Sequence, residues 1–291
     1  MGWAMTTCDP GAESALHALS VSVGPRAFQV LASAARCAFW RRVEAGAWEP
    51  QTFEVFRRFL QPDRSYIDLG AWIGPTVLYG AALSRCVHAV EPDPVAFAEL
   101  DRNVRANPGL CEKIHLHPFG IGPESGPLHL YAGGLYYAGH SEFGDSMSGM
   151  LAAPDVRGQP CHKARGVDME RFLDMYAGKN CNFIKMDIEG GEYAVIPGLW
   201  RRLWRWGPPT LFVCPSILRK SPGASPWCGP ASKSCCCVTR AFMRLPTPRP
   251  LRSKNWRTQC MTGATTPLAA PGASWRRCWE QVWWQPVRSG E

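Results

Sequence analysis

A glycine turn and an acidic strand end are the features of this sequence that could bind a nucleotide-like ligand. Residues 66–70 predict a short strand that ends in Gly70, and Gly74 opens the helix that follows. Glycine lets the chain turn sharply and lets a helix begin close to a ligand, where its free N–H groups can bind a carboxylate or another anion. Glu91 ends the next predicted strand, where a carboxylate can accept hydrogen bonds from both hydroxyls of a ribose.

The spacing within this unit narrows the choice of ligand. Glu91 follows Gly74 by 17 residues, close to the gap of about 20 residues expected of a nucleotide-binding unit. The loop itself reads D-x-G-x-x-x-G from Asp68 to Gly74, whereas a dinucleotide-binding loop reads G-x-G-x-x-G. The loop alone could be a tight strand-to-helix connection. Together with Glu91 it indicates a cofactor site, and its spacing argues against a nicotinamide dehydrogenase.

A second group of charged residues follows a later strand. Lys185, Asp187, Glu189 and Glu192 crowd a strand end where apolar packing would be the ordinary choice. Two structural explanations stay open: Glu192 is a favourable partner of a helix N-terminus, and Lys185 pairs with Glu192. Asp187 stands at the tip of its strand, so we expect it to face the same cleft as the glycine turn.

Three segments, taken together, resemble one protein family. The stretches YIDLGAWIGPT, VHAVEPDP and FIKMDIEGGEYAVIPGL, in this order and spacing, resemble the FkbM-type methyltransferases over about residues 45–213. Residues 167–173 resemble the segment before the family's acidic motif, and residues 144–147 resemble its Gly/Ser loop. The resemblance implies a Rossmann-like class I methyltransferase fold and S-adenosylmethionine as the methyl donor. It also implies a small-molecule acceptor, often a sugar or natural-product hydroxyl.

The resemblance assigns roles residue by residue. Asp68 to Gly74 would line the methionine part of the cofactor, Glu91 would bind its ribose, and residues 119–122 would lie near its adenine. The predicted cofactor-binding residues are Asp68, Gly70, Ala71, Gly74, Glu91, Gly120 and Ile121. The predicted catalytic residues at the methyl end are Asp187, Glu189 and Glu192. Asp187 is the first candidate for a general base. Glu189 could instead be a supporting carboxylate behind it or a metal ligand. The sequence as a whole predicts no metal site.

Alternating strands and helices must position these residues. The predicted strands are 66–70, 87–91, 114–118, 181–187 and 210–213, with a small antiparallel strand at 128–131. The predicted helices are 74–83, 93–107, 168–176 and 192–203. This alternation predicts an α/β domain over 61–213, with a mostly parallel sheet covered by helices on both faces. Apolar spacing predicts helices over 13–45 and 51–60, so residues 1–60 form a predicted N-terminal helical segment.

Residues 214–291 differ in composition from the rest of the chain. They carry 12 Lys and Arg against Glu280 and Glu291, together with ten Pro, six Trp and seven Cys. Proline removes donors from a sheet, so this tail cannot supply the missing C-terminal strands and we expect it to be mostly disordered. Shifted by one base, degenerate codons for residues 215–219 permit Ser-Leu-His-Pro-Pro, similar to the family's continuation. We therefore hypothesise a frameshifted tail and an enzyme that is inactive or poorly stable.

Composition sets the remaining expectations. With 291 residues, 46% of them apolar, the chain can bury a sizeable core. The sequence contains no apolar run of about 18 residues, so we predict no membrane span. The 13 cysteines show no zinc-ligand spacing, which favours a reducing, cytoplasmic compartment. The alternative function is nucleic-acid binding through the basic, Trp-rich tail, which we disfavour because no nucleic-acid-binding motif is present. Oligomeric state is not predicted.

Overall fold

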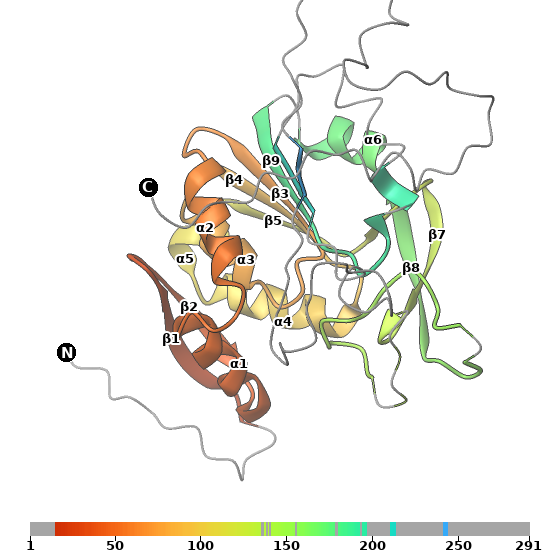
Figure 1. Cartoon of the computed structure of the whole chain (residues 1–291). Coiled ribbons are helices and arrows are strands. Elements are labelled where there is room, and N and C mark those ends of the chain that lie inside the picture. The colour runs from red at the N-terminus through yellow and green to blue at the C-terminus, as the bar shows by residue number, and fades with distance from the viewer. Residues whose placement is uncertain are drawn as a thin grey trace, which may run out of the picture. The chain divides into compact units, whose positions relative to one another are not determined.

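The computed structural model describes residues 15–134, 137, 139, 141–154, 156–177, 180–192, 194–196, 210–213 and 241–243. Strands in this part of the chain form three sheets, of which the six-stranded one is central (Figure 1). Its strand order is β11-β10-β9-β3-β4-β5. These strands are β3 (Ser65–Leu69), β4 (Cys86–Val90), β5 (Ile114–His117), β9 (Cys181–Met186), β10 (Thr210–Val213) and β11 (Ala241–Met243).

The central sheet is parallel except at one edge, which confirms the predicted α/β architecture. All neighbouring strands from β10 to β5 run parallel, and only β11 is antiparallel to β10. Helix α3 (Pro75–Ala81) connects β3 to β4, while α4 (Pro94–Arg105) and α5 (Pro108–Cys111) connect β4 to β5. Asp93 caps α4, because its Oδ1 accepts from the amides of Val95 at 2.9 Å and Ala96 at 3.2 Å.

Aromatic side chains cover both faces of this sheet. On one face, Phe56 of α2 (Pro50–Phe59) packs edge-on against Tyr66 and Phe183, with ring centroids 5.0 and 5.4 Å away. On the other face, Phe172 of α6 (Met169–Phe172) packs edge-on against His88 at 6.3 Å. The predicted helical coverage of both faces is thus confirmed, and Tyr66, His88 and Phe183 are buried beneath these helices.

The N-terminal segment corrects the prediction of one helix from residue 13 to residue 45. Strands β1 (His17–Val23) and β2 (Arg26–Ala32) form an antiparallel hairpin instead, and only α1 (Ala34–Glu44) and α2 are helical. Buried residues alternate with exposed ones along both strands, a period of two that we mistook for a helical one. Gly24, at φ +57°, opens the two-residue turn, for which a left-handed conformation is required.

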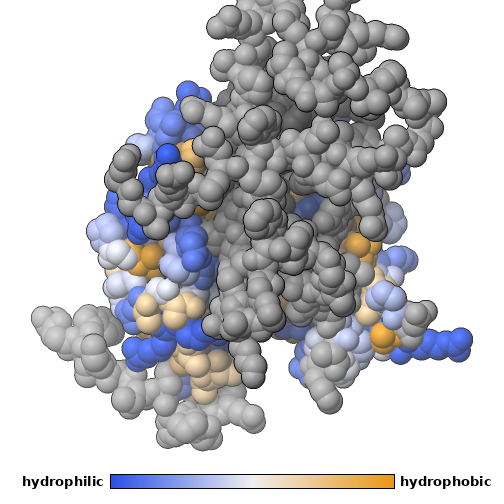
Figure 2. All heavy atoms as spheres, in the orientation of Figure 1, coloured by the Kyte–Doolittle hydropathy of each residue, from blue (hydrophilic) through white to orange (hydrophobic). Residues whose placement is uncertain are grey.

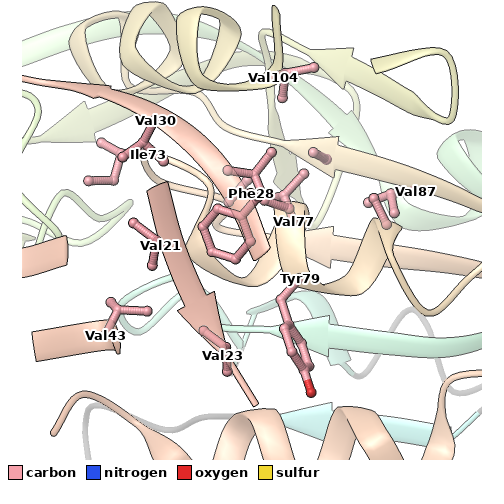
Figure 3. Packing of buried hydrophobic residues seen from close by; sticks show 14 of the residues in the cluster. Val21, Val23, Phe28, Val30, Val43, Ile73, Val77, Tyr79, Val87 and Val104 are labelled. Carbon is pink, nitrogen blue, oxygen red and sulfur yellow. The ribbon is translucent and has the colours of Figure 1, made fainter. Parts of the chain in front are cut away.

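The hairpin packs against the first helices of the central domain. Phe28 and Val21 lie in one cluster with Val77 and Tyr79 of α3 (Figure 3). Asn103 of α4 and Asn107, the residue before α5, also bind the backbone of β2. Asn103 accepts from the Leu31 amide at 2.9 Å and donates to the Ile73 carbonyl at 2.9 Å. Asn107 accepts from the Gln29 amide at 2.7 Å and donates to its carbonyl at 2.7 Å.

A three-stranded sheet, in the order β6-β8-β7, stands beside the central one (Figure 1). Its strands are β6 (Gly120–Gly122), β7 (Gly126–Tyr131) and β8 (Cys161–Asp168). The antiparallel strand predicted at 128–131 is confirmed, but β8 was not predicted. The helix predicted at 168–176 divides into α6 and a π-helical turn, Leu173–Ala177. The helix predicted at 192–203 is described only at 192 and 194–196, which are helical.

The C-terminal segment contributes one strand that the sequence did not predict. Residues 241–243 form β11 at the edge of the central sheet, so the expectation that the tail adds no strand is wrong there. The predictions of disorder and of a frameshift otherwise fall on residues outside the described part of the chain. Among the residues that are described, no helix is long and apolar enough to cross a membrane. In Figure 2, hydrophilic residues on the visible described surface surround small apolar areas.

The hairpin contacts predict a large stability effect for one asparagine. Replacing Asn103 by Ala leaves the Leu31 amide and the Ile73 carbonyl without partners, and each unsatisfied buried group costs about 1–3 kcal/mol. We expect urea denaturation to show a free energy of unfolding lower by at least about 2 kcal/mol. The control Arg105→Ala, at an exposed site on the same helix, should change little. Equal stability of the two variants would contradict this interpretation.

Candidate functional site

A cavity of about 370 Å³ opens where β3, β4 and β9 end. Parallel strands place their carboxyl ends at one edge of a sheet, so the segments that follow β3, β4 and β9 meet there. Most of the predicted site residues line this cavity: Gly70, Ala71, Glu91, Gly120, Ile121, Asp187 and Glu189. Asp68, Gly74 and Glu192 do not line it. The sheet therefore brings both predicted motifs to one site, as expected from their strand-end positions.

Asp68 lies beneath the cavity and is fully buried. Its Oδ1 accepts from Lys185 Nζ at 2.9 Å, and its Oδ2 accepts from the hydroxyls of Tyr66 and Thr76, both at 2.6 Å. Lys185 also donates to the carbonyl of Gly70 at 2.8 Å. Burial alone would lower the pKa of Lys185, but the carboxylates of Asp68 and Asp187 outweigh it and raise this pKa well above its usual range.

This pairing settles an alternative that the sequence left open. Lys185 pairs with Asp68 and not with Glu192, because residues 68 and 185 stand opposite each other on the adjacent strands β3 and β9. Their side chains consequently leave the sheet on the same face. The aspartate of the glycine turn therefore holds the second motif in place, rather than reaching the cavity itself.

Gly70 has a steric reason to be glycine. A Cβ on Gly70 would stand 1.9 Å from the backbone carbonyl oxygen of Asp187, and φ at this residue is +77°. The turn after β3 and the loop after β9 are therefore in direct backbone contact. Gly74 serves packing, because a Cβ there would stand 2.8 Å from Cδ1 of Leu100.

The backbone amides of the glycine turn are already bonded. The amides of Gly70 and Ala71 both donate to the carbonyl of Val90 at 3.1 Å. Helix α3 begins at Pro75, which has no N–H. The expectation that this turn presents free N–H groups to a ligand is therefore not met at these positions. The turn therefore lines the cavity with its backbone, since Gly70 has no side chain.

Glu91 lines the cavity where β4 ends. Its Oε2 accepts from the Trp72 amide at 2.7 Å and its Oε1 from the Asp93 amide at 2.8 Å. Burial raises the pKa of Glu91 to about 7, against the lowering effect of these two amides. Each carboxylate oxygen can accept a second hydrogen bond, so Glu91 can still bind a pair of hydroxyls when it is ionised.

Two further segments enclose the cavity. Gly120 and Ile121 of β6 form one wall, and a Cβ on Gly120 would stand 2.3 Å from Leu128 Cδ2 of β7. The loop after Gly144 forms another. Asp93 Oδ2 accepts from the Gly144 amide at 2.7 Å and from Ser148 Oγ at 2.9 Å.

Trp72 reinforces this second wall, because its Nε1 donates to the Gly144 carbonyl at 2.9 Å. The loop predicted at 144–147 from the family resemblance therefore lies at the cavity, where Asp145 and Met147 line it.

Asp187 is the polar side chain best placed to act on a ligand. It lines the cavity, and its Oδ1 is buried without a hydrogen-bond partner among the described residues. Burial raises the pKa of Asp187 well above its usual range. Lys185 opposes this rise, while the carboxylates of Glu189, Glu49 and Glu192 add to it. A carboxylate of raised pKa is a better proton acceptor than an exposed one.

Glu192 is buried and holds a loop in place. Its Oε1 accepts from the Ile188 amide at 2.7 Å and its Oε2 from the Gly190 amide at 2.8 Å. Burial raises the pKa of its carboxyl group. Glu192 therefore fixes the loop that carries Asp187 and Glu189, and the structure does not bring it to the cavity surface.

Trp48 and Glu49 line the cavity although the sequence analysis did not single them out. Glu49 precedes α2 with φ at 43°, and the other non-glycine residues with positive φ in the described chain are Trp72 (48°) and Glu189 (49°). All three line this cavity. Such strained backbone costs roughly 1–3 kcal/mol per residue and tends to cluster at functional sites. The one sequence signal for Glu49 is Pro50, which disfavours a helical conformation in the preceding residue.

Comparisons with known proteins bear on this site. Residues 68–212 match the methyltransferase FkbM domain, whereas no curated protein matches the chain. A methyltransferase FkbM from Methylobacillus flagellatus KT aligns with a TM-score of 0.36 and 16% identity over 62% of this chain; this chain spans 43% of that one.

Two other structures align at similar levels. An rRNA methylase from Streptococcus thermophilus gives a TM-score of 0.33 and 11% identity over 56% of this chain and 68% of that one. A putative methyltransferase from Streptococcus mutans in complex with SAH gives a TM-score of 0.32 and 7% identity. That alignment covers 56% of this chain and 69% of that one.

The buried ion pair predicts the behaviour of a Lys185 variant. Lys185→Met leaves the Asp68 carboxylate buried without its counter-charge, and removing one partner of a buried pair costs about 3–5 kcal/mol. We expect urea denaturation to show a loss of this size. Lys113→Met, at an exposed position, is the matched control. A Lys185→Met protein as stable as the control would show that the pair does not hold the two motifs together.

Proposed function

The chain belongs to the FkbM methyltransferase family through residues 68–212, and we propose that it uses S-adenosylmethionine to methylate a hydroxyl group of a sugar or natural-product-like small molecule. One observation carries this proposal. The backbone contact between Gly70 and Asp187 joins the predicted cofactor turn and the predicted catalytic loop at one cavity. A donor bound at the turn and an acceptor beside Asp187 would then be neighbours.

The residues around the cavity fit a cofactor of this kind. Gly70 and Gly120 line the cavity with backbone alone, and the volume of about 370 Å³ is of the size common to small-molecule sites, about 300–1,000 Å³. Ala71, Ile121 and Glu91 would complete the cofactor contacts, with Glu91 accepting from the ribose hydroxyls. S-adenosylmethionine supplies an activated methyl group on a sulfonium, so positioning the acceptor provides much of the rate.

Asp187 is proposed as the general base. Its Oδ1 faces no hydrogen-bond partner in the described chain and its pKa is raised, so it can take the proton of an acceptor hydroxyl. Glu189 lines the same cavity and would orient the acceptor. Asp68, Gly74 and Glu192 would act through the residues that they hold in place, and not through ligand contact.

The domain organisation follows from this assignment. We propose that residues 61–213 carry the catalytic site and that the N-terminal segment completes it through Trp48 and Glu49. A tail that impairs activity remains a hypothesis about residues 214–291, of which 241–243 are described. The alternative function, nucleic-acid binding through the basic tail, is likewise a hypothesis about residues 214–291. Sequencing the gene around codon 214 tests the frameshift, because an undisturbed reading frame would exclude it.

The pKa of Glu91 predicts how cofactor binding depends on pH. Only ionised Glu91 can accept from both ribose hydroxyls, so affinity for S-adenosylhomocysteine should rise roughly tenfold from about pH 6 to about pH 8. His88 and His117, with pKa values lowered by burial to about 4, do not titrate in this range. Isothermal titration of wild type and Glu91→Gln measures the effect. The variant should bind weakly and show no such rise, and a rise of equal size in both proteins would refute the role of Glu91.

Asp187→Asn separates catalysis from cofactor binding. Removing the proposed base should lower methyl transfer by about 10²- to 10⁴-fold and leave the affinity for S-adenosylhomocysteine nearly unchanged. Transfer of a labelled methyl group to a panel of sugar and natural-product hydroxyls provides the activity. Asp63→Asn, at an exposed aspartate, is the control. If the Asp187→Asn protein methylates as fast as the control, Asp187 is not the base.

A further inference from the structure

We propose that Trp48 and Glu49 form an acceptor subsite that selects hydroxyl compounds carrying an ammonium group over phosphorylated or carboxylated ones. This inference rests on the proposed function, because it concerns the acceptor of the same cavity. Both residues precede the matched family domain of residues 68–212, yet both line the cavity with Asp187 and Glu189. The acceptor side is therefore partly built by a segment outside that domain.

Glu49 is held in an unusual conformation at this wall. Its φ of 43° is left-handed, a conformation that an ordinary L-residue adopts at a cost of about 1–3 kcal/mol. Its Oε2 accepts from Thr52 Oγ1 at 2.7 Å, which fixes the carboxylate relative to the first turn of α2. Its charge is close enough to act on both Lys185 and Asp187. The strained backbone thus keeps a carboxylate beside the proposed base.

Trp48 supplies an aromatic surface next to this carboxylate. Its ring packs edge-on against Phe39, with centroids 5.2 Å apart, and at a tilt against Phe53 at 6.0 Å. These contacts fix the ring while it remains partly exposed at the cavity. A tryptophan face attracts a ligand cation, and it also covers the apolar C–H surface of a sugar-like ring. Trp48 and Glu49 can therefore bind the two parts of an amino-hydroxyl compound together.

The charges of the cavity favour the same class of acceptor. Among the described lining residues, the acidic side chains are Glu49, Glu91, Asp145, Asp187 and Glu189. Lys185 is the one cation in that lining, and its ammonium group is already bound to Asp68 and to the Gly70 carbonyl. A phosphate or carboxylate would enter a lining rich in acidic side chains whose one cation is already bound, whereas an ammonium group would find carboxyl oxygens there to accept its hydrogen bonds.

Calorimetric titration of the full chain tests this inference in two steps. The protein is first saturated with S-adenosylhomocysteine, and the absence of that binding would refute the proposed function itself. The complex is then titrated separately with glucosamine, glucose and glucose 6-phosphate. We expect glucosamine to bind most tightly and glucose 6-phosphate most weakly. If S-adenosylhomocysteine binds but glucosamine does not, or if glucose 6-phosphate binds equally well, the inference is overturned.

Variants of Glu49 assign the preference to this residue. Glu49→Gln should weaken glucosamine binding at least tenfold and reduce its advantage over glucose. Glu49→Gly also removes the carboxylate but relieves the left-handed strain, so it should fold at least as well and show the same loss. Glu54→Gln, at an exposed site on the adjoining helix α2, should bind like wild type. Unchanged glucosamine affinity in a folded Glu49→Gly protein would overturn the inference.

Discussion

The buried ion pair between Asp68 and Lys185 is the interaction on which the site depends. Two charges removed from water are tolerated only when they are paired and their remaining donors and acceptors are satisfied. Here Tyr66, Thr76 and the Gly70 carbonyl provide those additional bonds. The pair joins β3 to β9, and so it fixes the turn that follows one strand against the loop that follows the other. Both motifs are thereby held at one cavity.

Much of this arrangement could be predicted from the sequence because strand ends in a parallel sheet converge. The positions of Gly70, Glu91 and Asp187 at predicted strand ends were enough to place them at one edge. What the sequence could not show is which carboxylates face a ligand. Asp68 and Glu192 are of the same residue types as Asp187 and Glu189, but backbone and side-chain donors bind them in the interior.

The N-terminal segment shows a second limit of sequence interpretation. Apolar and polar residues alternate over residues 17–32, but Gly24 and Pro25 interrupt this alternation. The apolar residues also fit a helical period approximately, and this hid the two strands. The contribution of Trp48 and Glu49 to the cavity depends on tertiary packing, since α2 lies on the face of the sheet that Asp68 and Lys185 share. No local pattern encodes that contact. Under the proposed function, the family domain would bind the donor and hold Asp187, and the preceding segment would add Trp48 and Glu49 to the acceptor side.

We propose that the Gly70 turn, Glu91 and the Asp187 loop form one methyl-donor site. A crystal structure of the protein with S-adenosylhomocysteine tests it most directly. We expect the ligand in the cavity, with its ribose hydroxyls on Glu91 and its sulfur on the side of Asp187. Ligand density at another surface, for instance the groove between β7 and β8 lined by Lys163 and Arg165, would contradict it.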